Sequence, residues 1–249
     1  MTLLAVCGEA STTTAYALAV GWPTREVLLM EADPSGGDLA AWLDVPEQPG
    51  VATAVASAPS GEWPVIQAQC QRHGELDVLV MPIRAGEAAV AAREAANRLA
   101  PTLSALAGLI AIADCGRTHS AGLSSVLTQA AMAVVTVRQP RTSPRAAAAA
   151  LDRVGELIDA LAARALPVAA VVVGEEPYRA SEISDYLGGV VPVPVLVIAD
   201  DPVGAALVAG RDRIGRGFPR TQLARTATAA ASELAVRLSS IRSVDGLVR

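Results

Sequence analysis

Hydroxyl side chains follow the first apolar run of this sequence, at the point where a strand would end. After the run 2–6 (TLLAV) come a glycine and then a serine followed by three threonines. A turn of this kind before a helix presents unpaired backbone N–H groups, which together with the helix dipole attract phosphate. The alternative is that the hydroxyls of residues 11–13 only cap the helix. The candidate phosphate-binding residues are Gly8, Ser11, Thr12, Thr13 and Thr14.

A carboxylate ends another apolar run, in the segment 109–120 (LIAIADCGRTHS). Asp114 comes directly after this run, which is the usual place for a carboxylate that holds Mg²⁺ through water. We therefore expect a magnesium site at Asp114, with the hydroxyl of Thr13 as a second ligand and that of Thr14 as the alternative.

Two more acidic residues leave the apolar run of the segment 28–43 (LLMEADPSGGDLAAWL). Glu31 and Asp33 lead into a Pro-Ser-Gly-Gly turn and are candidates for orienting a metal-bound water. The alternative is an ordinary strand-to-helix turn, in which Asp38 caps the following helix.

The basic residues are unusual, because all twenty are arginine and none is lysine. Arginine does not imitate the compact point charge of a lysine ammonium. Any phosphate site in this chain therefore works without lysine. Arg138, Arg141 and Arg145 follow the apolar run 132–137, and we interpret them mainly as solvated residues flanking a helix, with partial neutralisation of an anion as the alternative.

Length and composition favour one large α/β domain spanning residues 1–249. Apolar residues make up 52% of the chain and aromatic residues only 3%, so the core must be aliphatic. No apolar stretch reaches the ~20 residues that a membrane span needs, and no secretory signal is visible at Met1, so we expect a cytoplasmic protein. Cys7 and Cys115 both follow apolar runs, but two thiols are too few for a zinc site.

Short apolar runs alternate with amphipathic stretches along the chain, a rhythm typical of a doubly wound, mostly parallel sheet flanked by helices, as in P-loop NTPases. About seven strands are expected, at 2–6, 26–31, 76–81, 108–113, 132–137, 167–173 and 194–198. Helices are expected at 12–21, 38–44, 86–98, 120–130, 144–164, 179–187, 201–210 and 221–241, the last packed on the sheet. Thr12 or Thr13, Ser143 and Ser181 are the expected helix caps. The segment 45–63 is expected to form mobile surface elements.

The order of these motifs resembles the ParA/MinD family of deviant Walker ATPases over nearly the whole chain. The strongest matches are the Thr-Thr helix start, the EADPSGGD loop (31–38) and the late segment 199–210 (ADDPVGAALVAG). The family loop is K-G-G-x-G-K-[ST]-[ST]. Laid on it, Cys7 takes the place of the signature lysine, Ser11 that of the last glycine and Thr12 that of the P-loop lysine. The chain is most similar to actinobacterial members with a degenerate Walker A loop, of the TadZ/CpaE kind.

The resemblance implies roles for the carboxylates and for the chain as a whole. Thr13 would be the Mg²⁺-binding hydroxyl, Asp114 the Walker B carboxylate, and Asp33 the catalytic member of the acidic pair if the chain hydrolyses ATP. ATP and Mg²⁺ would be the cofactors. The family implies a homodimer with a protein partner. The expected function is a scaffold or positioning factor for a secretion, pilus or cell-organisation machine, with weak or no ATP hydrolysis.

Two other functions are compatible with these residues. One is a slow Mg²⁺-dependent ATPase whose Walker A loop lacks lysine. The other is a non-specific DNA-binding partition protein, because the segment 211–225 (RDRIGRGFPRTQLAR) holds five arginines and one acidic residue. A solvated basic face is the favoured interpretation of that segment.

Overall fold

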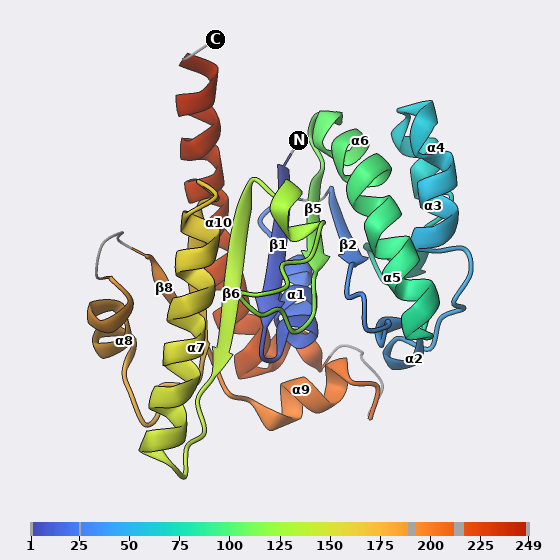
Figure 1. Ribbon diagram of the computed structural model, residues 1–249. Helices are drawn as coiled ribbons and strands as arrows, with labels where there is room; N and C mark the ends of the chain where they lie inside the picture. Colours follow the sequence, from blue (N-terminus) through green and yellow to red (C-terminus); the bar gives the residue numbers. More distant parts are fainter. Residues whose placement is uncertain (1, 25, 189–192, 212–216, 248–249) are drawn as a thin grey trace.

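The computed structural model describes residues 2–24, 26–188, 193–211 and 217–247, the last six without their side chains. In this part of the chain eight strands form one sheet, ordered β3-β4-β2-β5-β1-β6-β7-β8 (Figure 1). Every neighbouring pair is parallel except β3 with β4. The strands are β1 (Thr2–Gly8), β2 (Val27–Glu31), β3 (Gln71–His73), β4 (Leu76–Leu79), β5 (Ile110–Asp114), β6 (Met132–Arg138), β7 (Val168–Val173) and β8 (Val195–Ile198).

This sheet confirms the expected α/β, mostly parallel architecture, and seven of its strands coincide with the predicted runs. The eighth, β3, reads Gln-Arg-His and is only partly buried, so it carries no apolar signal. It is an antiparallel edge strand, a common addition to an otherwise parallel sheet.

Helices cover both faces of the sheet (Figure 1). One core lies between the sheet and α1 and α10, and the other between the sheet and α3, α5, α6 and α7. Side chains of β1 alternate between the two cores, with Leu4 and Val6 in the first and Leu3, Ala5 and Cys7 in the second. The helices are α1 (Ser11–Val20), α2 (Leu39–Trp42), α3 (Val51–Ser57), α4 (Trp63–Gln67), α5 (Ala85–Glu94), α6 (Ala100–Ala105), α7 (Pro144–Ala162), α8 (Ala180–Leu187), α9 (Pro202–Val208) and α10 (Gln222–Leu247).

The helix caps follow the predictions only in part. Ser143 caps α7 by accepting a hydrogen bond from the backbone N–H of Ala146 at 3.2 Å, as predicted. The prediction for α1 is wrong, because its N-cap is Ala10 in a left-handed conformation, and no side chain caps this helix. The prediction of Ser181 is also wrong, since α8 already begins at Ala180.

Several segments differ from the sequence prediction, among them α4 and α6, where no helix was expected. The helix expected at 120–130 is absent, and only the 3₁₀ turn Leu127–Gln129 forms there. Gly122 and the neighbouring serines explain this, because both residue types favour turns over a helix interior. The segment 45–63 instead contains α3, whose Val51 and Ala54 are fully buried.

The C-terminal helix α10 packs against α1 and β8. Its apolar side is made of residues such as Leu223, Leu234 and Leu238, all nearly inaccessible to solvent. Within the described residues, no helix combines the length and the apolar character that crossing a bilayer requires.

Candidate functional site

The predicted site residues come together at the carboxyl ends of three adjacent strands, β2, β5 and β1. The strand register places Asp114 opposite Val6 of β1 on one side and opposite Glu31 of β2 on the other. The helix α1 begins three residues after the end of β1, above the same edge. Ligands of parallel α/β sheets bind outside the carboxyl ends of the strands, so this edge is the candidate site.

Asp114 is the centre of this site and is only 2% exposed. Burial raises its pKa, because the ionised form is poorly solvated, and the nearby Asp33 carboxylate acts in the same direction. Hydrogen bonds from the hydroxyls of Thr12 and Ser11 and from the backbone N–H of Gly116 oppose the rise by stabilising the carboxylate. Asp114 is thus enclosed by donors from α1 and from the turn after β5.

The hydroxyls that lower the pKa of Asp114 belong to Thr12 and Ser11, whereas the sequence pointed to Thr13, with Thr14 as the alternative. Thr12 and Thr13 differ by one residue, which is about 100° around a helix. The pairing depends on where α1 begins, and that point follows from the length of the connection before it. Thr13 as the hydroxyl ligand of a magnesium ion stays a prediction.

The connection between β1 and α1 consists of only two residues, Glu9 and Ala10. In G-x-x-x-x-G-K-[ST] the first glycine stands seven residues before the hydroxyl residue. Counting back from Thr12 gives Ala5, and counting back from Thr13 gives Val6. Both are fully buried and paired with β5 and β6 inside the sheet. The backbone that would wrap around phosphates thus begins within β1 and continues through Glu9 and Ala10 into the start of α1.

This short connection is also fixed to the neighbouring strand β6. The Glu9 N–H donates to the Thr136 carbonyl at 3.1 Å, and the Thr136 hydroxyl reaches the carbonyls of Cys7 at 3.0 Å and Glu9 at 2.7 Å. Gly8 has a φ of 113°, and a Cβ there would collide with the Thr136 carbonyl. Only glycine fits at position 8, because of this contact and the left-handed conformation.

Glu31 anchors the loop after β2 through its carboxylate. Its Oε1 accepts hydrogen bonds from the N–H groups of Asp38 at 2.7 Å and Leu39 at 2.8 Å, and its Oε2 from that of Met81 at 2.8 Å. Burial raises the pKa of Glu31 to about 7 despite these three donors. Glu31 therefore caps α2, and the expectation that Asp38 does so is wrong, since the Asp38 side chain makes no capping bond.

Asp33 lies close to the turn after β5. Its Oδ1 accepts a hydrogen bond from the Ser35 N–H at 2.7 Å, and its carboxylate is packed against Gly116, where any Cβ would collide with it. Asp33 and Asp114 thus lie near each other at this edge of the sheet.

The arginines near the site are mostly engaged elsewhere. Arg138 forms an ion pair with Asp200 at 3.0 Å, and Arg141 pairs with Glu176 at 2.8 Å. Arg117 is exposed, and it lines a cavity of about 300 Å³ together with Gly8 and Glu9. The carboxylates at the site itself outnumber the cations, and this electrostatic environment disfavours a polyanion.

Cys7 lies near the end of β1, and Cys115 directly follows β5. Both thiols are free and fully buried. Burial raises the pKa of Cys7 to about 12, and that of Cys115 well above its ordinary value. Both therefore remain neutral thiols. Over the described residues, no cluster of three or more His, Cys, Asp or Glu side chains is arranged to hold a metal ion.

The arginine-rich segment 211–225 is only partly described. Arg211, Arg220 and Arg225 are exposed, whereas residues 212–216, with two of the five arginines, lie outside the described residues.

The architecture is similar to that of several solved ATPase structures. The ParA family ATPase from Chlorobium tepidum TLS superposes with a TM-score of 0.69, over 92% of this chain and 98% of its own, at 16% sequence identity. The cell division ATPase MinD of Pyrococcus furiosus gives a TM-score of 0.67 over 94% and 98%, at 17% identity. The chain has the ParA/MinD fold.

A third structure extends this likeness beyond ParA and MinD proteins. Cobyrinic acid a,c-diamide synthase from Mycobacterium smegmatis, with a bound ATP analog and magnesium, gives a TM-score of 0.61 over 96% of both chains at 19% identity. No family model matches the sequence of this chain, and no curated protein matches it either. The ParA/MinD fold of this chain is therefore identified by structural similarity and not by sequence similarity.

Two residues of the candidate site, Thr136 and Glu9, were not predicted from the sequence. Thr136 braces the β1–α1 connection from β6, and its signal, a threonine inside the apolar run 132–137, does not differ from that of an ordinary strand residue. Glu9 was not singled out, although an acidic residue two positions before the first hydroxyl of a candidate phosphate loop disfavours phosphate binding.

Proposed function

We infer that this chain is a scaffold or positioning protein of the ParA/MinD fold that binds Mg-ATP weakly and does not hydrolyse it. The connection between β1 and α1 carries this inference, because Thr136 holds the backbone of Cys7 and Glu9 and because Glu9 brings a negative charge to the place of the phosphates. The absence of lysine from the whole sequence and the closure of Asp114 onto Thr12 and Ser11 support it. The degenerate loop links the chain to the TadZ/CpaE kind of member.

The expected loss of affinity follows from the missing cations. A hydrogen bond to a charged group contributes roughly 1.5–3 kcal/mol, so two absent lysines remove on the order of 3–6 kcal/mol. Micromolar binding corresponds to about −8 kcal/mol, and such a loss brings it to millimolar or weaker. The residues present therefore do not fit a tightly held Mg-ATP.

The names of fold relatives support the positioning role and a protein partner. They include the septum site-determining protein MinD from Pyrococcus horikoshii and a MinC:MinD cell division protein complex from Aquifex aeolicus. We propose that this chain acts with a protein partner in a secretion, pilus or cell-organisation machine in the cytoplasm, and that it is a homodimer, as its resemblance to the ParA/MinD family implies. Light scattering should give twice the monomer mass without added nucleotide.

Isothermal titration with Mg-ATP tests the proposal. The expected dissociation constant is in the high micromolar range or weaker, and the Asp114→Ala variant should give the same weak signal. A low-micromolar constant for the unaltered chain that is lost in Asp114→Ala would contradict the proposal.

The Thr12–Asp114 contact favours one second candidate function, a slow Mg²⁺-dependent ATPase that uses Asp33 to orient the attacking water. A hydroxyl beside a carboxylate is a ligand set that Mg²⁺ accepts. For this candidate, phosphate release must disappear in Asp114→Ala and survive in Thr12→Ser, which keeps the hydroxyl. Equal release from Asp114→Ala would identify a contaminating enzyme instead.

A further inference from the structure

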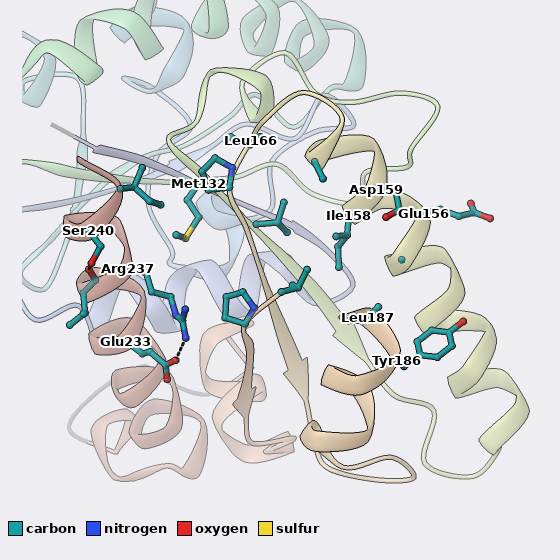
Figure 2. Close-up of a pocket in the computed structure, with 18 of the residues that line it drawn as sticks. Met132, Glu156, Ile158, Asp159, Leu166, Tyr186, Leu187, Glu233, Arg237 and Ser240 are labelled. Atoms are coloured by element: carbon teal, nitrogen blue, oxygen red, sulfur yellow. Dashed lines mark hydrogen bonds and ion pairs between the residues drawn. The ribbon is translucent and has the colours of Figure 1, made fainter. Parts of the chain in front are cut away.

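A large groove lies at the edge of the sheet opposite the candidate site. It has a volume of about 1230 Å³ and opens at the amino ends of β6, β7 and β8. Its floor is apolar and includes Met132, Val168 and Val193. Figure 2 shows α10 on one side of this groove and α7 and α8 on the other.

Two apolar side chains of the groove face solvent. Val236 of α10 is 67% exposed and Tyr186 of α8 is 56% exposed. Large apolar side chains that gather in a concave surface typically mark a binding site, unlike isolated exposed ones. The Tyr186 hydroxyl hydrogen-bonds to the Asp152 carboxylate of α7, which ties the ring to this position.

The α7 side of the groove is acidic. Asp152, Glu156 and Asp159 follow one another at intervals of four and three residues, so they lie on one side of α7, and all three line the groove. All three are exposed, and none forms a salt bridge within the described part of the chain. The opposite side of α7, with residues such as Leu151 and Leu157, is buried against the sheet.

The α10 side of the groove carries an ion pair between one basic and one acidic residue. Arg237 donates to the Glu233 carboxylate at 2.7 Å, as the dashed line in Figure 2 shows. The Arg237 Nε is buried and has no hydrogen-bond partner among the described residues. In the part of the chain that the structure describes, the groove thus has three acidic side chains without an ion-pair partner on one side and the Arg237–Glu233 ion pair on the other.

We propose that this groove is a docking surface for a cationic amphipathic segment of a partner protein. The apolar side chains of such a segment would cover Val236, Tyr186 and the floor, and its basic side chains would face Asp152, Glu156 and Asp159. Charge complementarity selects this occupant over a second copy, because a second copy would bring a chain with a net charge of −5. The inference supplies the partner chemistry for the proposed scaffold role, but it uses no residue of the candidate nucleotide site.

The probe is a fluorescent 18-residue helical peptide of leucine and arginine, with a leucine face and an arginine face, titrated with the full chain without nucleotide. The matched peptide carries glutamate in place of arginine. The arginine peptide should bind, and its affinity should fall as salt rises from about 0.05 to 0.5 M, because screening shortens the reach of exposed charges. The glutamate peptide should not bind.

Variants of the chain test whether the peptide binds in the groove. The triple variant Asp152→Asn, Glu156→Gln, Asp159→Asn should weaken binding about tenfold or more. Its control, Glu47→Gln, Glu62→Gln, Glu75→Gln, changes the net charge equally at exposed residues outside the groove and should bind normally. Val236→Ser should also weaken binding, whereas Val90→Ser, at an exposed valine of α5, should not.

Three results would overturn the proposal. Equal affinity of both triple variants would show attraction to overall charge and not to the groove. Binding of the glutamate peptide as tightly as the arginine peptide would remove the charge argument. A dimer that dissociates in Val236→Arg would show that a second copy covers the groove. Since no nucleotide is present, failure here leaves the Mg-ATP titration unaffected.

Discussion

Glu31 Oε2 accepts a hydrogen bond from the backbone N–H of Met81 at 2.8 Å, which joins the end of β2 to the segment after β4, fifty residues further along the chain. The other oxygen of the same carboxylate holds the first turn of α2. One buried side chain thus positions the loop that carries Asp33. This contact makes Glu31 a positioning residue, although the sequence suggested a role in orienting water.

We expect Glu31→Gln to destabilise the fold by about 1–3 kcal/mol, since the glutamine amide group would face one of the N–H donors and leave it unpaired. Urea unfolding measures this change. Glu26→Gln, at an exposed glutamate before β2, is the matched control and should stay within about 0.5 kcal/mol of the unaltered chain. Equal stability of Glu31→Gln would contradict the anchoring role.

Glu31 also makes stability depend on pH near neutrality. Its pKa of about 7 in the folded protein lies above the ordinary glutamate value, so the folded state binds the proton more tightly than the unfolded state. This group therefore favours folding at pH 5 and loses that contribution as pH rises through 7. The slope of unfolding free energy against pH between 5 and 7 should be less negative in Glu31→Gln. The same slope in both proteins would show that Glu31 ionises normally.

Thr12 and Thr13 should differ sharply when replaced by valine. Thr12→Val removes a hydroxyl that hydrogen-bonds to the buried Asp114, at a cost of about 1–3 kcal/mol, because the charged group loses a donor. Thr13→Val is expected to change stability by less than about 0.5 kcal/mol. Thermal unfolding of the two variants compares them directly. A larger effect at Thr13 would restore the pairing that the sequence suggested.

Gly116 should not tolerate a side chain. Its φ is 63°, and a Cβ would collide with the Asp33 carboxylate, so Gly116→Ala should cost about 1–3 kcal/mol. Gly122→Ala is the control, since nothing lies within 4 Å of a Cβ at that position. Adding Asp33→Gly to Gly116→Ala should recover the steric part of the loss, because glycine removes every Asp33 side-chain atom that the new Cβ would meet. No recovery would show that the backbone conformation alone causes it.

Asp201 caps two helices at once. Its Oδ1 accepts from the N–H groups of Val203 and Gly204 at the start of α9, and its Oδ2 from those of Gln222 and Leu223 at the start of α10, at 2.9 to 3.2 Å. Burial acts to raise the pKa of Asp201, but the four backbone donors outweigh it and lower the pKa below the ordinary value.

A carboxylate with a lowered pKa stabilises the fold above its ordinary pKa of about 4, and this contribution is lost as pH falls through the folded value. Asp201→Asn should therefore destabilise the chain by about 1–2 kcal/mol at pH 7 and by less at pH 3. Asp38→Asn is the matched control, because Asp38 stands at the start of α2 without a side-chain capping bond. A loss that does not depend on pH would argue against ionic capping.

Much of the fold was predictable because strands buried on both faces of a parallel sheet have unbroken apolar sequences. Asp114 and Asp33 were found for the same reason, since each follows such a run directly. The role of Glu31 was not predictable, because its partner Met81 is fifty residues away and offers only a backbone N–H. The choice between Thr12 and Thr13 required the exact start of α1, which depends on Ala10 adopting a left-handed conformation that alanine rarely takes.

The contacts between Thr136 and the β1–α1 connection have a consequence for the history of this protein. The family loop fits residues 7–14 without a gap, so the chain lacks side chains there and not chain length. Replacing Thr12 with lysine would restore one charge, but Glu9 would remain an acidic neighbour and Thr136 would still hold the carbonyls of Cys7 and Glu9. A return to nucleotide chemistry would need several substitutions together.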